Sequence, residues 1–127
     1  MNHFEWTWDS KGRKVYAQGW TPANVKAVVC LVHGFAEFSD RYEHVAKFLC
    51  DAGFAVLAYD QLGHGKTEGK RGHADYEDML DNVKTILQEA DTPSVANCLQ
   101  STLTYRDLLL MNVDGKRECA STLGILV

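Results

Sequence analysis

Short apolar runs separated by glycine turns set the pattern of this chain. Residues 4–9 and 13–20 alternate apolar and polar side chains around the turn Ser10-Lys11-Gly12. Such alternation predicts a β-hairpin. Two continuous apolar runs follow, at residues 26–32 and 54–59. Runs of this kind, rich in β-branched residues, are typical of strands that are buried on both faces.

Two segments, 40–52 and 74–90, carry apolar residues at helical spacing. In the first, Asp40 is placed to cap the opening turn, and Gly53 to end the helix in a left-handed conformation. In the second, apolar residues including Tyr76 line one face, and the acidic residues are expected on a solvated face. Because the first helix joins two buried strands with a short return, the pattern predicts a parallel βαβ unit. The fold class is therefore α/β.

Two glycine motifs follow the two buried strands directly. His33-Gly34 ends the first strand, and Arg41-Tyr42 follows it at the start of the helix. Asp60-Gln61-Leu62-Gly63-His64-Gly65 follows the second strand. The spacing of a phosphate-binding loop is not met, because Asp60 stands where its first glycine is required. Ligands of open α/β sheets bind at the carboxyl ends of such strands.

These motifs resemble the HG-x-G/A-E-H-S-x-R-Y segment and the D-x-x-G-H-G-x-S-x-G loop of the monoacylglycerol lipase and lysophospholipase branch of the α/β-hydrolases. The resemblance covers roughly residues 5–93. It implies the N-terminal portion of an α/β-hydrolase with an incomplete sheet, and it makes the Phe35 backbone N–H one half of an oxyanion hole. Phe38 stands where the family usually has a second His. The residues that support the motifs are His33, Gly34, Glu37, Asp60, Gly63, His64 and Gly65.

The chain departs from this family after its second helix. The family's next strand ends in a Gly-x-Ser-x-Gly turn that carries the nucleophile, followed along the chain by Asp or Glu and then by His. The sequence contains no Gly-x-Ser-x-Gly, and no histidine follows His73. We therefore expect residues 1–91 to be the N-terminal part of the hydrolase domain. Residues 92–127 are expected to be a segment foreign to the family, with one helix from Ser94 to Val113 and an apolar tail.

Two functional interpretations follow. The chain is a fragment or variant of a serine ester hydrolase, without a complete catalytic triad and inactive alone, or it is a non-catalytic interaction module derived from the hydrolase fold. A frame-shift, a splice variant and a genuine replacement are all compatible with residues 92–127. Haloalkane or epoxide chemistry would need an Asp nucleophile at the same missing turn. Proline-releasing aminopeptidases resemble the His33-Gly34 region, but Glu37 to Tyr42 and Lys70 to His73 favour the lipase branch.

Composition limits the partners. Hydrophobic residues make up 46% of the 127 residues and charged residues 24%, with a net charge of −4. Because no basic run occurs, we expect no nucleic-acid partner, and no apolar stretch is long enough to span a membrane. The resemblance implies that the substrate of the full family protein is a lipid or small acyl ester. Peripheral membrane contact is compatible with the sequence, and no cofactor or metal is expected.

The cysteines Cys30, Cys50, Cys98 and Cys119 form no C-x-x-C pair, which favours reduced thiols in the cytoplasm.

Overall fold

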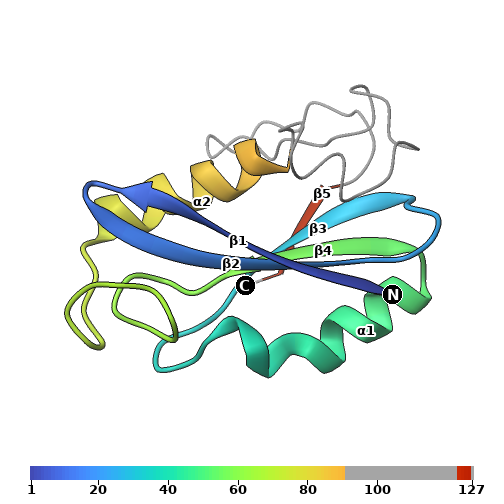
Figure 1. Cartoon of the computed structure of the whole chain (residues 1–127), viewed down its shortest axis with the longest axis horizontal. Coiled ribbons are helices and arrows are strands. Elements are labelled where there is room, and N and C mark those ends of the chain that lie inside the picture. The colour runs from blue at the N-terminus through green and yellow to red at the C-terminus, as the bar shows by residue number, and fades with distance from the viewer. Residues whose placement is uncertain (91–122, 127) are drawn as a thin grey trace.

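The computed structural model describes residues 1–90 and 123–126, which form a five-stranded mixed sheet with a helix on each face. The sheet has the strand order β1-β2-β4-β3-β5 (Figure 1). Its strands are β1 Asn2–Ser10, β2 Arg13–Thr21, β3 Ala27–Val32, β4 Phe54–Tyr59 and β5 Leu123–Leu126. The helices are the 3-10 helix η1 Ser39–Tyr42, α1 Glu43–Asp51 and α2 Tyr76–Glu89.

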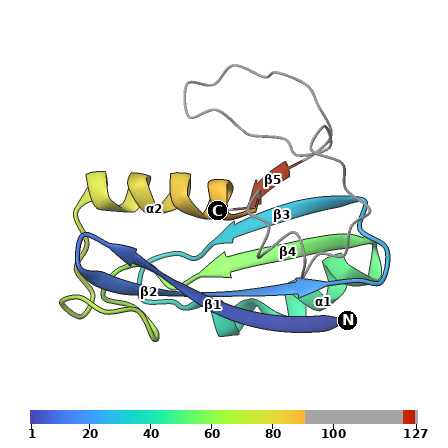
Figure 2. The same cartoon turned by 45° about the horizontal axis from the view of Figure 1, so that its top comes forward.

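The hairpin and the parallel pair predicted from the sequence are both confirmed. β1 and β2 pair antiparallel over nine residues each, and their register has Trp6 opposite Ala17. β3 and β4 pair parallel, from Ala27 opposite Phe54 to Val32 opposite Tyr59. Figure 2 shows both strands pointing the same way, so their carboxyl ends meet at one edge of the sheet.

Alternate residues of the central strands build two separate cores. On one face, Val28 and Cys30 of β3 pack in a cluster that includes Ile86 and Leu87 of α2. On the other face, the β3 residues Val29 and Leu31 pack with Ala46 and Cys50 of α1. This arrangement explains the continuous apolar runs, because a strand with a helix on each face is buried on both sides.

The first predicted helix is divided and is not capped as expected. Residues 39–42 form the 3-10 helix η1, and α1 begins only at Glu43. Asp40 lies inside η1, and its carboxylate accepts a hydrogen bond from Gln18 Nε2 at 2.6 Å, so the prediction that it caps the helix is wrong. Gly53 does follow α1 with a left-handed φ of +91°, as predicted.

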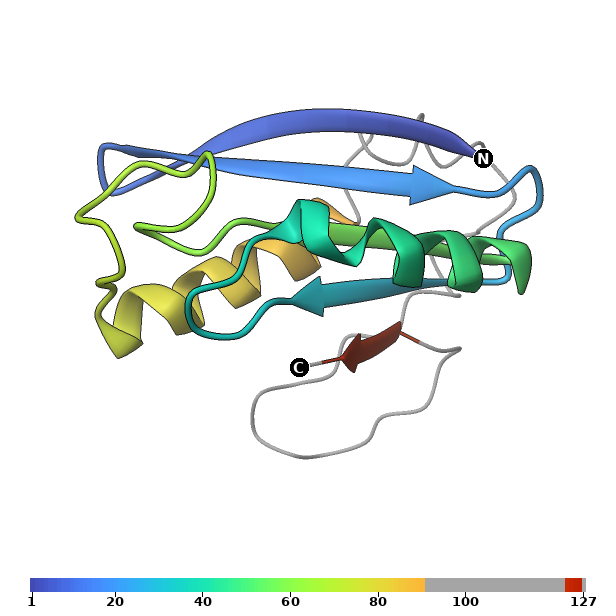
Figure 3. The same ribbon diagram turned by 90° about the horizontal axis from the view of Figure 1, so that it is seen from below.

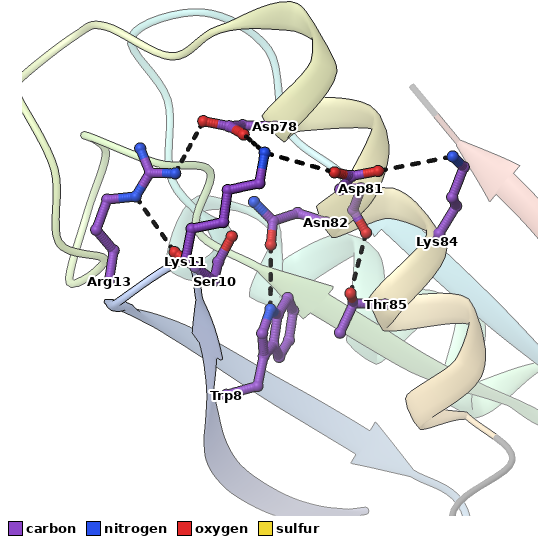
Figure 4. Close-up of polar contacts among 9 residues, drawn as sticks. All are labelled: Trp8, Ser10, Lys11, Arg13, Asp78, Asp81, Asn82, Lys84 and Thr85. Carbon is purple, nitrogen blue, oxygen red and sulfur yellow. Dashed lines mark hydrogen bonds and ion pairs between the residues drawn. The ribbon is translucent and has the colours of Figure 1, made fainter.

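Helix α2 differs from its predicted faces at two positions. Tyr76 is 71% exposed and lies outside the core. Asp78 is buried, although the acidic residues of this helix were expected in solvent, and Asn82 is buried beside it. Figure 4 shows the reason: Asp78 binds Lys11 and Arg13 beside the hairpin turn, and the Asn82 Oδ1 accepts a hydrogen bond from Trp8 Nε1 at 3.1 Å.

Strand β5 is a feature that the sequence did not predict. It pairs parallel with β3, with Val28 opposite Leu123 and Leu31 opposite Leu126. The helix expected from Ser94 to Val113, together with Cys98 and Cys119, lies outside the described residues. Cys30 and Cys50 are free and buried, and no helix in the described part of the chain has the length and apolar character needed to cross a membrane.

Candidate active site

The site is built where β3 and β4 end side by side. Val32 is the last residue of β3 and lies opposite Tyr59, the last residue of β4. The residues that follow them, His33 and Asp60, are 1% and 2% exposed. Parallel pairing therefore brings together the two motifs that the sequence placed 27 residues apart.

His33 connects the two strand ends through both of its ring nitrogens. Nε2 accepts a hydrogen bond from the Gln61 backbone N–H at 2.9 Å, which leaves the proton on Nδ1. Nδ1 donates to the Gly34 carbonyl at 2.7 Å. The Gln61 side chain returns a hydrogen bond from its Nε2 to the His33 carbonyl. Burial lowers the pKa of His33, so the ring stays neutral and acts as a brace for the turn.

Asp60 holds two loops at the same time. One carboxylate oxygen accepts the Ser39 backbone N–H at 2.6 Å, and the other accepts the Lys66 backbone N–H at 2.8 Å. Its own carbonyl accepts the Thr67 hydroxyl at 2.7 Å. The start of η1 and the glycine loop are thus fixed to one buried carboxylate. Ser39 and Lys66 are partners that sequence reasoning did not identify, because backbone donors leave no mark in the residue pattern.

Gly65 is required by its closeness to Asp60. Its φ is +49°, and an added Cβ would lie 2.1 Å from Asp60 Oδ2. Elsewhere in the loop, the Gly63 N–H donates to the Glu68 carbonyl at 3.1 Å and the Gly63 carbonyl accepts the Gly72 N–H at 2.9 Å. The glycine loop is therefore compact.

A tight turn at residues 34–37 presents the Phe35 backbone N–H. The Glu37 N–H donates to the Gly34 carbonyl at 3.3 Å, and Ala36 has a φ of +60°. A hydrogen bond of this span with a left-handed third residue defines a type II turn. Among residues 1–90 and 123–126 the Phe35 N–H has no acceptor, and its side chain is 80% exposed. A free donor at a strand end is what an oxyanion site needs.

The far side of this turn is tied to the first helical turns. The Glu37 carboxylate accepts the Tyr42 hydroxyl and lies 3.6 Å from the Arg41 guanidinium. These contacts lower the pKa of Glu37, with the Tyr42 hydrogen bond as the largest cause. Phe38 is 40% exposed, so the position where the lipase branch usually has a second His carries an apolar group instead.

His64 packs beside the turn without hydrogen bonding to it. Its Nδ1 donates to the Leu62 carbonyl at 2.9 Å, and its ring centroid lies 5.4 Å from that of His33 and 5.9 Å from that of Phe35. The hydroxyl of Ser39 accepts a hydrogen bond from Gln18 Nε2 at 2.7 Å. Among residues 1–90 and 123–126, no serine is hydrogen bonded to a histidine, the arrangement that activates a serine nucleophile.

Three comparisons with known proteins show which family this chain belongs to. A family model described as "Serine aminopeptidase, S33" matches residues 23–98. A monoacylglycerol lipase of Mycolicibacterium smegmatis is 38% identical over 60% of this chain and 28% of its own length. The human monoglyceride lipase is 33% identical over 66% of this chain and 27% of its own length.

A solved structure shows the same arrangement of elements. A thermostable carboxyl esterase from Bacillus coagulans, in complex with glycerol, is 33% identical and superposes with a TM-score of 0.64. The match covers 72% of this chain and 32% of that one. This chain therefore spans less than a third of the length of each of these three relatives.

Proposed function

Because the chain belongs to the serine aminopeptidase S33 family and has the N-terminal part of the α/β-hydrolase fold, we propose that it carries one half of an oxyanion site for ester hydrolysis. The observation that carries the proposal is the Phe35 N–H, which has no acceptor within the described residues and is presented by a type II turn at the end of β3. A donor that is already oriented stabilises the oxygen charge of a tetrahedral intermediate without reorganising during the reaction.

The substrate class we propose is a carboxylic ester with an apolar acyl chain, such as a monoacylglycerol or lysophospholipid. Relatives of this chain are named monoacylglycerol or monoglyceride lipases. The exposed aromatic rings of Phe35 and Phe38 flank the turn and would favour an apolar group there. The buried free thiols of Cys30 and Cys50 support a reducing compartment, and we place the protein in the cytoplasm.

The 127-residue chain, by itself, is proposed to be inactive as a serine hydrolase. It supplies a donor but no Gly-x-Ser-x-Gly turn, and no histidine after His73. We expect no saturable turnover of p-nitrophenyl butyrate and no stoichiometric labelling of a serine by a fluorophosphonate probe. The human monoglyceride lipase, assayed in parallel, is the positive control. Rapid saturable turnover with one labelled serine would refute this.

A chimeric enzyme tests the Phe35 donor directly. Residues 1–90 of this chain would replace the matching part of the Mycolicibacterium smegmatis lipase. Phe35 is the second residue of the type II turn, where proline is well accepted, so F35P removes the N–H with little change of shape. We expect F35P to lower kcat about a hundredfold or more, whereas F35A keeps the N–H and loses little. Equal activity of the two variants, or a folded but inactive chimera, would contradict the proposal.

The second candidate is a non-catalytic interaction module. The observation that favours it is β5, which fills the sheet position beside β3 with residues 123–126, beyond the family match that ends at residue 98. A chain that is soluble and unfolds in one cooperative transition would favour a rebuilt domain. Soluble aggregate or a chaperone-bound chain would favour an interrupted hydrolase.

A further inference from the structure

The outer edge of β1 is the longest free backbone edge in the described part of the chain. β1 lies at one margin of the sheet and runs for nine residues beside β2 (Figure 3). Its register with β2 is unbroken from Asn2 opposite Thr21 to Ser10 opposite Arg13. The strand therefore offers an uninterrupted row of backbone groups to an incoming strand.

The hydrogen bonds of β2 show which residues of β1 face outward. The Tyr16 N–H donates to Thr67 Oγ1, and the Tyr16 carbonyl accepts the Asp60 N–H, so both groups point away from β1. Tyr16 lies opposite Thr7. In an antiparallel pair, residues that do not bond to each other direct their N–H and C=O to the far sides. Thr7 and the alternate residues His3, Glu5 and Asp9 therefore direct their backbone groups to the free edge.

This edge lacks most of the features that normally block pairing. Natural edge strands carry charged side chains, especially lysine, or a proline or a bulge. Residues 2–10 contain no Lys, Arg or Pro, the pairing with β2 shows no bulge, and the charged residues are Glu5 and Asp9. Phe4, Trp6 and Trp8 line one face and are only partly buried. The strand therefore keeps apolar surface that a further strand would cover.

The sequence of β1 is complementary to itself in one antiparallel register. With Trp6 opposite Trp6, the outward residues pair as His3 with Asp9 and Glu5 with Thr7, and no like charges meet. Phe4 then lies opposite Trp8 at a close, non-hydrogen-bonded position, where aromatic pairs are favourable. Shifting the centre to residue 5 sets Glu5 opposite Glu5. Shifting it to residue 7 sets Glu5 opposite Asp9.

We propose that β1 is the docking edge for a second copy of this chain. The two copies pair antiparallel about a two-fold axis at Trp6, and one sheet continues through both. The backbone of His3, Glu5, Thr7 and Asp9 supplies the hydrogen bonds, and the charges of the side chains set the register. This dimer is independent of the proposed catalytic role, because the Phe35 turn lies at the ends of other strands.

The solution mass of the full 127-residue chain, measured by analytical ultracentrifugation across a wide concentration range, tests this directly. We expect a monomer–dimer equilibrium. T7P removes an N–H that faces outward and leaves the hydrogen bonds to β2 intact, so it should abolish the dimer. A wild-type monomer at every concentration, or a dimer that T7P does not affect, would overturn the proposal.

Two charge variants test the register even if proline disturbs the hairpin. In the T7E dimer, each of the two substituted side chains would lie opposite Glu5 of the other copy. This like-charge pairing should raise the dimer dissociation constant about fivefold. T7K sets opposite charges there and should not weaken it. Thr7 is exposed in the monomer, so both variants should melt alike when dilute. Equal dimer affinities for T7E and T7K would overturn the register. A Thr7 amide protected from hydrogen exchange in the monomer would instead place another segment on this edge.

Discussion

Two buried aspartates, Asp60 and Asp78, hold loops to the body of the molecule in different ways. Asp60 accepts the backbone N–H groups of Ser39 and Lys66. Asp78 accepts hydrogen bonds from the long side chains of Lys11 and Arg13, which are 61% and 32% exposed. A backbone donor cannot rotate away, whereas a solvated ammonium group retains much of its hydration and freedom.

Because of this difference, Asp60 determines the positions of the loops around the candidate site, whereas Asp78 only attaches the hairpin turn to α2. The Asp60 contacts fix the start of η1, which follows the Phe35 turn, and the glycine loop. The Asp78 contacts hold the hairpin turn against α2, and ion pairs whose cationic partners remain solvated add little stability. The position of the candidate site therefore depends on Asp60.

The largest expected effect is that of D60A. It leaves the buried N–H group of Ser39 and the partly buried N–H group of Lys66 without an acceptor, and we expect a loss of about 4 kcal/mol in the free energy of unfolding. Urea denaturation followed by circular dichroism measures this. D78A is the matched control, and it should cost much less. Equal losses for the two variants would remove the distinction between the aspartates.

A smaller effect is expected at Gly65, where the close approach to Asp60 can be separated from the backbone conformation. Gly12 also has a positive φ, +82°, but an added Cβ there meets nothing within 4 Å. We expect G65A to cost about 3 kcal/mol and G12A about 1 kcal/mol. Melting temperatures of both variants measure the difference. Similar losses would show that backbone strain alone, and no contact with Asp60, explains the glycine.

The smallest effect concerns the pH dependence of the Asp78 contacts. The hydrogen bonds from Lys11 and Arg13 lower the pKa of Asp78 below its ordinary value of 3.8. A carboxyl with a lowered folded pKa stabilises the fold above its unfolded pKa, and this is lost as the pH falls through the folded value. The melting temperature of D78N should therefore lie slightly below wild type at neutral pH, and the gap should close below pH 3.8. A gap that is independent of pH would contradict this assignment.

The elements of the βαβ unit could be predicted because their sequence periods are local. The apolar runs at residues 26–32 and 54–59 were sufficient to predict the two strands. The place of Gly53 directly after the helical pattern was sufficient to predict its left-handed conformation. The roles of Asp40 and Asp78 could not be predicted in this way. Their partners Gln18 and Lys11 lie on the hairpin, far away in sequence, so neither partner appears in the helical pattern.

The candidate site was predictable as a set of motifs but not as a geometry. The resemblance placed Phe35 and Asp60 in two separate motifs, and parallel pairing of β3 with β4 joined them. Strand β5 was missed for the same physical reason, since Leu123 reaches Val28 across nearly the whole chain. Long-range pairing of this kind leaves no local signal in a single sequence.

Hydrogen exchange of three amides, measured by NMR on the full chain, tests the central claim most directly. Asp60 fixes the loops around a turn whose Phe35 N–H has no acceptor in the described part of the chain. We therefore expect the Ser39 and Lys66 amides to be strongly protected and the Phe35 amide to exchange close to the unprotected rate. A Phe35 amide as protected as that of Ser39 would mean that its N–H already has an acceptor, and the oxyanion assignment would then be wrong.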